Sequence, residues 1–344
     1  MKIAVYTIAL NEEKFVERWY ESAKDADYLL IADTGSTDKT KRIAKKLGIK
    51  VIDISIKPWR FDDARNAALA SLPDDIDYCV SMDMDETLSE GWREKLETMT
   101  SDQVSYRFNL TYKDAEEEHP DQTFVNNRIH KRHGFRWHFL MHEVLVPNRK
   151  SCSVEFCEGL EVSHHPDQEK SREQYNQMIE DAYYEYKNPR YTIYHILELL
   201  RFKRVDEAIS ILKLLIKNKE SSKIDVALAY TVLGTLMPKF KTIYFFKSLS
   251  IFPTRETYTH LAITYCLKEK WFRAYYFGKK ADAIKVKTNS ILKDHNVWGF
   301  LPFNIMSAGK HNMWLFKWSR SYKLKKKEIN LASYISHKFK LFAD

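Results

Sequence analysis

Short apolar runs alternate with amphipathic segments along the first quarter of the sequence, and this alternation constrains the fold more than any other feature. Four runs rich in β-branched and apolar residues predict strands: residues 2–10, 27–36, 50–56 and 77–83. Three segments with helical spacing separate them: residues 12–25, 37–48 and 62–72. The alternation predicts an α/β fold in which a mostly parallel sheet is flanked by helices. Because ligands bind at the carboxyl ends of such strands, the turns that follow them should share one functional edge.

The character of the chain changes near Pro166. Up to His165 there are 23 Lys and Arg against 30 Asp and Glu, whereas from Pro166 onward there are 32 against 17. The second part has helical periodicity, and at an offset of 66 Leu197 matches Ile263 and Val205 matches Trp271. That offset is close to twice the roughly 34-residue tetratricopeptide period. We therefore expect two domains, 1–168 and 169–344, the second an all-α array of tetratricopeptide-like hairpins or, alternatively, an irregular helical bundle.

The basic second part limits the choice of partners. Its charge would attract nucleic acid, an anionic membrane surface or an acidic glycan or peptide, although a solvated charged face is the alternative. The helices could also support a homo-oligomer. No stretch approaches the roughly 18 apolar residues of a membrane span, and the N-terminus has the pattern of a strand, not of a signal peptide. The four cysteines lack CxxC spacing, so we expect reduced thiols, no zinc site and a cytoplasmic protein, with peripheral attachment to the inner membrane face as a variant.

Polar residues that could carry chemistry follow the predicted strands. Asp33 ends a strand and precedes a Gly turn and a capped helix, while Arg65 begins a helix beside Asp62 and Asn66. In SMDMDE, Asp83 and Asp85 project to the same side of an extended segment, and Glu86 is expected to support the turn. Paired carboxylates suit Mg²⁺ or Mn²⁺. Each stretch alone is also compatible with an ordinary capped helix or solvated turn.

Taken in order, IALNEE, DTGSTDKT, FDDARN, MDMDE, an HE pair and a strand-borne His resemble glycosyltransferase family 2. The resemblance covers about residues 1–165 and implies the Rossmann-like GT-A nucleotide-sugar fold, with tetratricopeptide-like helices appended as in one bacterial and phage branch. It also implies a role for individual residues. Asp33 would pair with a uracil-type base, Asp83 would face the ribose and sugar, and Asp85 would hold the metal. His164, or its neighbour His165, would complete the metal site. The remaining implied contacts are the pocket residues Thr7, Ala9 and Glu12, the base Glu143, and the phosphate or sugar ligands Arg65, Arg128 and Arg132.

These residues together predict a metal-dependent, inverting glycosyltransferase of the hexosyltransferase type. A sugar would pass from a nucleoside diphosphate, a UDP-sugar for preference, to a hydroxyl or thiol on a glycan, a peptide or protein, or a modified nucleic acid. Asp85 and Glu143 would be the catalytic residues, with Mn²⁺ or Mg²⁺ as cofactor. A catalytically inactive scaffold of the same fold and a nucleotidyltransferase are the alternatives.

Overall fold

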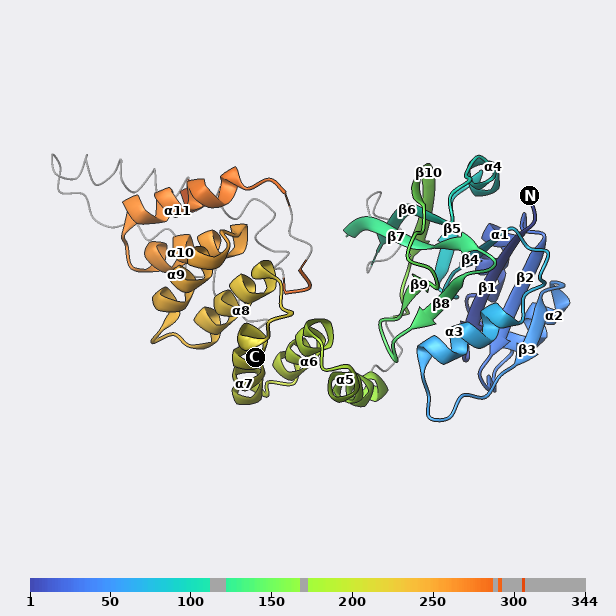
Figure 1. Ribbon diagram of the computed structural model, residues 1–344, viewed down its shortest axis with the longest axis horizontal. Coiled ribbons are helices and arrows are strands. Elements are labelled where there is room, and N and C mark those ends of the chain that lie inside the picture. The colour runs from blue at the N-terminus through green and yellow to red at the C-terminus, as the bar shows by residue number, and fades with distance from the viewer. Residues whose placement is uncertain (112–121, 168–172, 287–289, 293–304, 307–344) are drawn as a thin grey trace. The chain divides into compact units, whose positions relative to one another are not determined.

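The computed structural model describes residues 1–111, 122–167, 173–286, 290–292 and 305–306 (Figure 1). The chain divides into two compact units, Met1–Gln174 and Tyr175–Asp344. Within the described residues, no helix combines the length and the apolar character needed to cross a membrane. The predicted succession of an α/β domain and an all-helical domain is confirmed.

The first unit is built on an eight-stranded sheet in the order β3-β2-β1-β4-β7-β6-β10-β5. Its first half pairs in parallel, as the alternation predicts, whereas β7 runs antiparallel to β4 and β6, and β5 runs antiparallel to β10. A separate two-stranded hairpin is formed by β8 and β9. The strands are β1 (Ile3–Ala9), β2 (Tyr28–Asp33), β3 (Lys50–Asp53), β4 (Tyr78–Ser81), β5 (Glu86–Leu88), β6 (Gln103–Leu110), β7 (Gln122–Lys131), β8 (Phe135–His138), β9 (Val144–Pro147) and β10 (Val154–His164). The helices are α1 (Val16–Ala23), α2 (Thr40–Lys46), α3 (Phe61–Ala70) and α4 (Trp92–Glu97).

Two hydrophobic cores cover the two faces of the sheet. Alternate residues of β1 point to opposite faces, so that Ile3 and Val5 join one core while Ala4 and Tyr6 join the other. The first core packs against α1, α2 and α4, and the second packs against α3 and the β8–β9 hairpin through Trp137. Burial on both faces explains why these strands are nearly continuous in apolar character. The carboxyl ends of the strands remain available for polar side chains.

A chain of hydrogen bonds crosses the second core. The Trp137 Nε1–H donates to Tyr6 Oη at 2.9 Å, and Tyr6 Oη lies 3.3 Å from His130 Nε2. His130 Nδ1 lies 2.8 Å from the carbonyl of Lys131, so that Nδ1 carries the proton and Nε2 accepts from Tyr6. Burial lowers the pKa of His130 to about 4. The imidazole is therefore neutral in the folded protein.

We expect acid to destabilise the first unit through His130. Its pKa is lower in the folded state than in the unfolded state, so the unfolded chain binds the extra proton, and stability falls as the pH drops from about 6.5 to about 4. A shift of this size corresponds to a loss of about 3 kcal/mol. Chemical denaturation across this range should show that His130→Gln flattens the pH dependence. The same change at exposed His133 should leave the dependence as in the parent protein, and equal slopes in both variants would contradict the assignment.

The second unit consists of helical hairpins. Its helices are α5 (Glu173–Tyr186), α6 (Pro189–Arg201), α7 (Val205–Lys217), α8 (Lys223–Leu236), α9 (Lys241–Ile251), α10 (Arg255–Leu267) and α11 (Trp271–Ala283). The α6–α7 and α10–α11 hairpins begin 66 residues apart at both of their helices, which agrees with the repeat seen in the sequence. The α8–α9 hairpin occupies the place of the repeat between them. An array of tetratricopeptide-like hairpins therefore describes this unit.

Candidate active site

Asp33 lies at the carboxyl end of β2, and its side chain is fully buried. Asp33 Oδ1 accepts the backbone N–H groups of Gly35 and Ser36 at 3.0 and 2.8 Å. The turn depends on Gly35, whose φ of 119° is open to glycine and strained for other residues. Asp33 Oδ2 has no hydrogen-bond partner among the described residues. One buried carboxylate oxygen is thus held in place and able to accept a hydrogen bond from a ligand.

The predicted pocket residues of the first strand lie beside Asp33. The Ala9 carbonyl accepts from the N–H and the hydroxyl of Thr34, at 2.9 and 3.0 Å, and so joins the ends of β1 and β2. Glu12 follows in the adjoining turn, where its N–H donates to Thr40 Oγ1 at 2.8 Å. Thr7 lies deeper in β1, buried, with its hydroxyl donating to the Ile8 carbonyl. Thr7 therefore supports the strand, while Ala9 and Glu12 lie at its functional edge.

The three carboxylates of the acidic turn after β4, Asp83, Asp85 and Glu86, have different surroundings. Asp83 is half-buried and faces two arginines, and Asp85 faces His164 at the end of β10. Glu86 is fully buried, and its Oε2 accepts the N–H of Asp83 at 2.8 Å. Glu86 thus closes the turn from beneath, while Asp83 and Asp85 remain at its surface.

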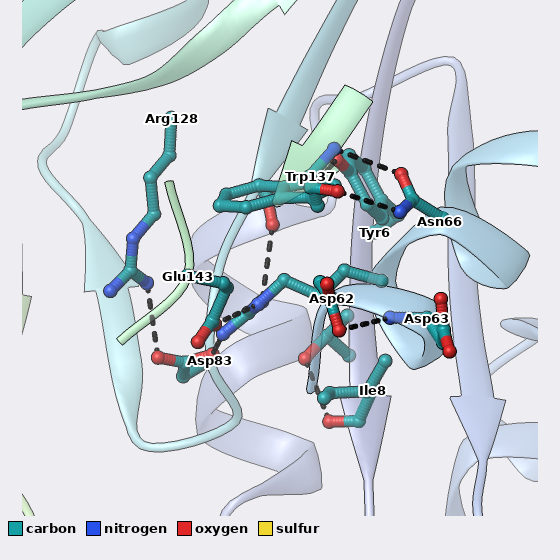
Figure 2. A network of polar contacts seen from close by, with 12 residues as sticks. Tyr6, Ile8, Asp62, Asp63, Asn66, Asp83, Arg128, Trp137 and Glu143 are labelled. Carbon is teal, nitrogen blue, oxygen red and sulfur yellow. Dashed lines mark hydrogen bonds and ion pairs between the residues drawn. The ribbon is translucent and has the colours of Figure 1, made fainter. Parts of the chain in front are cut away.

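Arg65 connects the acidic turn to Glu143, and Arg128 contacts the turn at Asp83 and Glu86. Figure 2 shows Asp83 with Arg128 and Glu143 beside it. Buried Arg65 donates from Nη2 to Asp83 Oδ1 at 2.5 Å and from Nε to Glu143 Oε1. Arg128 Nη1 lies 3.0 Å from Asp83 Oδ2 and 3.1 Å from Glu86 Oε1. Both Asp83 oxygens are therefore occupied by guanidinium groups. Two cations hold three carboxylates in one cluster.

The pKa values of Asp83 and Glu86 are shifted in opposite directions within the cluster. Burial opposes ionisation of Asp83, but the charges of Arg65 and Arg128 outweigh it and hold its pKa well below the usual range. For Glu86, burial dominates and the Asp83 charge adds to it, so that the pKa rises to about 7 although Arg128 opposes the rise. Burial, together with the charge of Asp83, therefore makes Glu86 the carboxylate of the cluster that is protonated most readily.

Removal of Arg128 should destabilise the first unit strongly. An Arg128→Met substitution leaves Asp83 with one cation and Glu86 with none, and breaking such a buried network costs about 3 kcal/mol. The matched control is Arg107→Met, which removes an exposed pair with Glu161 and should cost less than about 1 kcal/mol. Urea denaturation followed by tryptophan fluorescence measures both values. A similar loss in the free energy of unfolding for the two variants would show that solvent screens the charges of the cluster.

The β8–β9 hairpin, which leads to Glu143, is fastened to α3 by Asn66. The Asn66 side chain accepts the Trp137 N–H at 2.9 Å and donates to the Trp137 carbonyl at 2.8 Å, as a neighbouring strand would (Figure 2). The Phe61 N–H also donates to the Leu140 carbonyl at 3.0 Å. Arg65 packs over the Trp137 ring, with 5.1 Å from Cζ to the ring centroid. Adjacent residues of α3 therefore hold the hairpin backbone and the Glu143 carboxylate.

Comparison with known proteins gives the family of this unit. Residues 4–149 match the family model described as Glycosyl transferase family 2. The first unit therefore contains a glycosyltransferase family 2 domain over these residues. An uncharacterized glycosyltransferase of Rickettsia bellii is 32% identical over 108 residues, which cover 31% of this chain and 35% of that protein. A counterpart in Rickettsia conorii is 36% identical over 97 residues, covering 28% and 33% of the two proteins.

Further similarities are more limited. A TPR repeat-containing protein of Synechococcus elongatus is 34% identical over 97 residues, which cover 27% of this chain and 23% of that protein. The chain spans about a third of the length of the Rickettsia relatives it matches. Glucosyl-3-phosphoglycerate synthase from Mycobacterium tuberculosis, solved with Mn²⁺, UDP and glucosyl-3-phosphoglycerate, is 26% identical, with 33% of this chain and 44% of that chain covered and a TM-score of 0.26. S. aureus TarS is 13% identical, with 84% and 56% covered and a TM-score of 0.36.

The first unit brings Asp85 and His164 together as a candidate metal-binding pair. His164 Nε2 lies 3.1 Å from Asp85 Oδ2, and both side chains are about one-quarter exposed. Burial lowers the pKa of His164, but the hydrogen bond and charge of Asp85 outweigh it and raise the pKa overall. The described residues contain no cluster of three or more His, Cys, Asp or Glu side chains suited to a metal. The pair therefore fits a cation that takes its other ligands from a diphosphate and water, as Mg²⁺ and Mn²⁺ do.

Two further predicted residues have other contacts in the first unit. His165 donates its backbone N–H to the Asp85 carbonyl at 3.1 Å and so shapes the turn, leaving His164 as the side chain that faces Asp85. Arg132 lies at the opposite end of β4, where it donates to the carbonyls of Leu72 and Pro73 at 2.8 and 3.0 Å. Its neighbourhood contains none of the other predicted site residues, so we leave Arg132 out of the candidate site.

Proposed function

We propose that this chain transfers a sugar from a nucleoside diphosphate to an acceptor nucleophile, with inversion at the anomeric carbon. The observation that carries the proposal is the pair of separated acidic positions on one edge of the sheet: Asp85 with His164, and Glu143 beyond Asp83. An inverting displacement requires one position for the leaving group and another for the attacking group. The glycosyltransferase family 2 domain supports this reaction class.

A UDP-sugar fits the Asp33 carboxylate better than a GDP-sugar. Asp33 Oδ1 already accepts two backbone N–H groups, so only Oδ2 remains to accept from a base. Uracil presents one N–H on its pairing edge, whereas guanine presents an N–H and an adjacent amino group that call for two acceptors. The single available oxygen therefore favours uracil.

Different residues act on the leaving group and on the attacking group. Asp85 and His164 would hold a divalent cation, and an imidazole ligand favours Mn²⁺ over Mg²⁺. When bound, such a cation neutralises the charge that develops on the leaving diphosphate. Glu143 takes the proton of the acceptor hydroxyl or thiol while the bond from that atom to C1 forms and the bond from C1 to the diphosphate oxygen breaks. Arg65 orients the Glu143 carboxylate through Oε1.

Donor hydrolysis tests this proposal without knowledge of the acceptor. Purified protein is incubated with a panel of UDP- and GDP-sugars, with Mn²⁺ or with EDTA, and the released nucleotide is measured. A parallel incubation with UTP and a sugar 1-phosphate is assayed for pyrophosphate. We expect Mn²⁺-dependent release of UDP, together with thermal stabilisation by UDP and Mn²⁺. Stabilisation without turnover of any donor would support an inactive scaffold, and release of pyrophosphate from UTP in the presence of a sugar 1-phosphate would indicate a nucleotidyltransferase. Both outcomes would contradict sugar transfer.

A further inference from the structure

Large apolar side chains are exposed on α9 and α11 of the second unit. Both helices are drawn in orange in Figure 1. On α9, Phe240, Ile243 and Lys247 follow helical spacing, with Ile243 56% exposed. On α11, Phe272, Tyr276 and Lys280 do the same, with Phe272 72% exposed. Single exposed apolar residues are common, but two apolar stripes on adjacent helices mark an interaction surface.

Ring contacts join the two stripes into one surface. Phe246 of α9 lies with its ring centroid 6.3 Å from that of Phe277 on α11, and Phe277 lies 5.2 Å from Tyr276. Lys280 Nζ is 5.8 Å from the Tyr276 ring centroid, and Lys247 Nζ is 5.9 Å from that of Tyr244. We call this the α9–α11 surface; its residues are Phe240, Ile243, Phe246, Lys247, Phe272, Tyr276 and Lys280.

The charged residues of helices α9 and α11 are mostly cations. Helix α9 contains Lys241 and Lys247 and no acidic residue. Helix α11 contains three cations, Arg273, Lys279 and Lys280, and one acid, Asp282. Asp282 Oδ1 lies 3.1 Å from Lys285 Nζ and 3.9 Å from Arg255 Nη2, so this acid is already paired. The face therefore presents exposed apolar groups among unbalanced cations.

We propose that the α9–α11 surface docks on the anionic face of a lipid bilayer. Exposed aromatic and aliphatic side chains flanked by lysines match the boundary between lipid headgroups and acyl chains, where the rings insert and the cations meet anionic headgroups. Nucleic acid would also meet the cations and stack on the rings, but aliphatic Ile243 gains from insertion into lipid and not from stacking. The proposal is independent of the donor site and of its chemistry.

Vesicle flotation of the full chain tests the proposal. We expect binding to vesicles of phosphatidylcholine mixed with phosphatidylglycerol, and little binding to phosphatidylcholine alone. Lys247→Glu combined with Lys280→Glu should weaken binding at least about tenfold, since each surface cation contributes to attraction by anionic lipid. Phe272→Ser should weaken it several-fold by removing an inserted ring. The chain beyond residue 306 is unchanged in every variant, so any contribution from it stays constant.

Helix α7 supplies the matched controls. Leu214 is 54% exposed there, between exposed Lys213 and Lys217, and α7 also contains Asp206 and Glu207. Leu214→Ser, and Lys213→Glu combined with Lys217→Glu, should leave vesicle binding unchanged, and circular dichroism verifies folding of all variants. The proposal is overturned if the parent protein does not bind anionic vesicles, or if the α7 variants and the α9–α11 variants change vesicle binding equally. It is also overturned if Phe272→Ser leaves vesicle binding unchanged while charge reversal weakens binding to RNA.

Discussion

We expect Asp85→Ala to lower donor hydrolysis by about three orders of magnitude, because the neighbouring carboxylates of the described turn, Asp83 and Glu86, are engaged elsewhere. Asp83 is held by Arg65 and Arg128, and Glu86 is buried beneath the turn. Steady-state release of UDP, measured over a titration of Mn²⁺, gives the result. EDTA should abolish the activity of the parent protein, and added Mn²⁺ should restore it there but not in Asp85→Ala.

Asp75→Ala is the matched control for Asp85. Asp75 precedes β4 as Asp85 follows it, and Asp75 is an exposed residue paired with Lys2. Its removal should leave hydrolysis unchanged. His164→Gln should move the Mn²⁺ titration to higher concentration, because the cation would lose one of two protein ligands. Full activity of Asp85→Ala at any Mn²⁺ concentration would exclude Asp85 as the metal-binding residue.

Glu143→Gln lowers kcat by about two to four orders of magnitude and changes the donor KM little, as expected for loss of a general base. Glutamine keeps an oxygen that accepts from Arg65 Nε, so the cluster and the fold persist. Glu143→Ala should lose stability as well as activity, because Arg65 would then retain only Asp83 as an ionic partner. Kinetics with water as acceptor, combined with urea denaturation, separate the two effects. Parent-like kcat in Glu143→Gln would place the base elsewhere.

Local periodicity was sufficient to predict half of the sheet. The parallel strands β1 to β4 and the helices between them follow from alternating patterns within short windows, and so does the helical repeat of the second unit. The pairing of β5 with β10 joins Leu88 to Val162, and no local pattern encodes a contact across so much sequence. The β8–β9 hairpin was not predicted either. Its hydrogen bonds to α3 are made by main-chain atoms of Trp137 and Leu140, and main-chain atoms leave no pattern in the sequence.

The candidate site divides in the same way. Asp33, Asp83 and Asp85 end predicted strands, so the sequence indicated their shared edge before the fold was known. Arg132 could not be distinguished from Arg128 in this manner, since both belong to one basic, aromatic segment. Their difference is set by position along β7 and the turn after it: Arg128 reaches Asp83, whereas Arg132 reaches the loop after α3. The burial of Glu86 depends on the β5–β10 pairing and was equally beyond a local pattern.

The bond between Asn66 and Trp137 has a consequence for mutational repair. Both partners of the Asn66 amide are main-chain atoms of residue 137, so the contact does not depend on which side chain stands there. A defect caused by Asn66→Ala therefore has no reciprocal substitution at residue 137 that could restore it. Suppressors selected against such a defect should instead fall within the hairpin turn, where they would stiffen residues 139–143 directly. The Arg65–Glu143 pair, made by two side chains, remains open to compensation by paired changes.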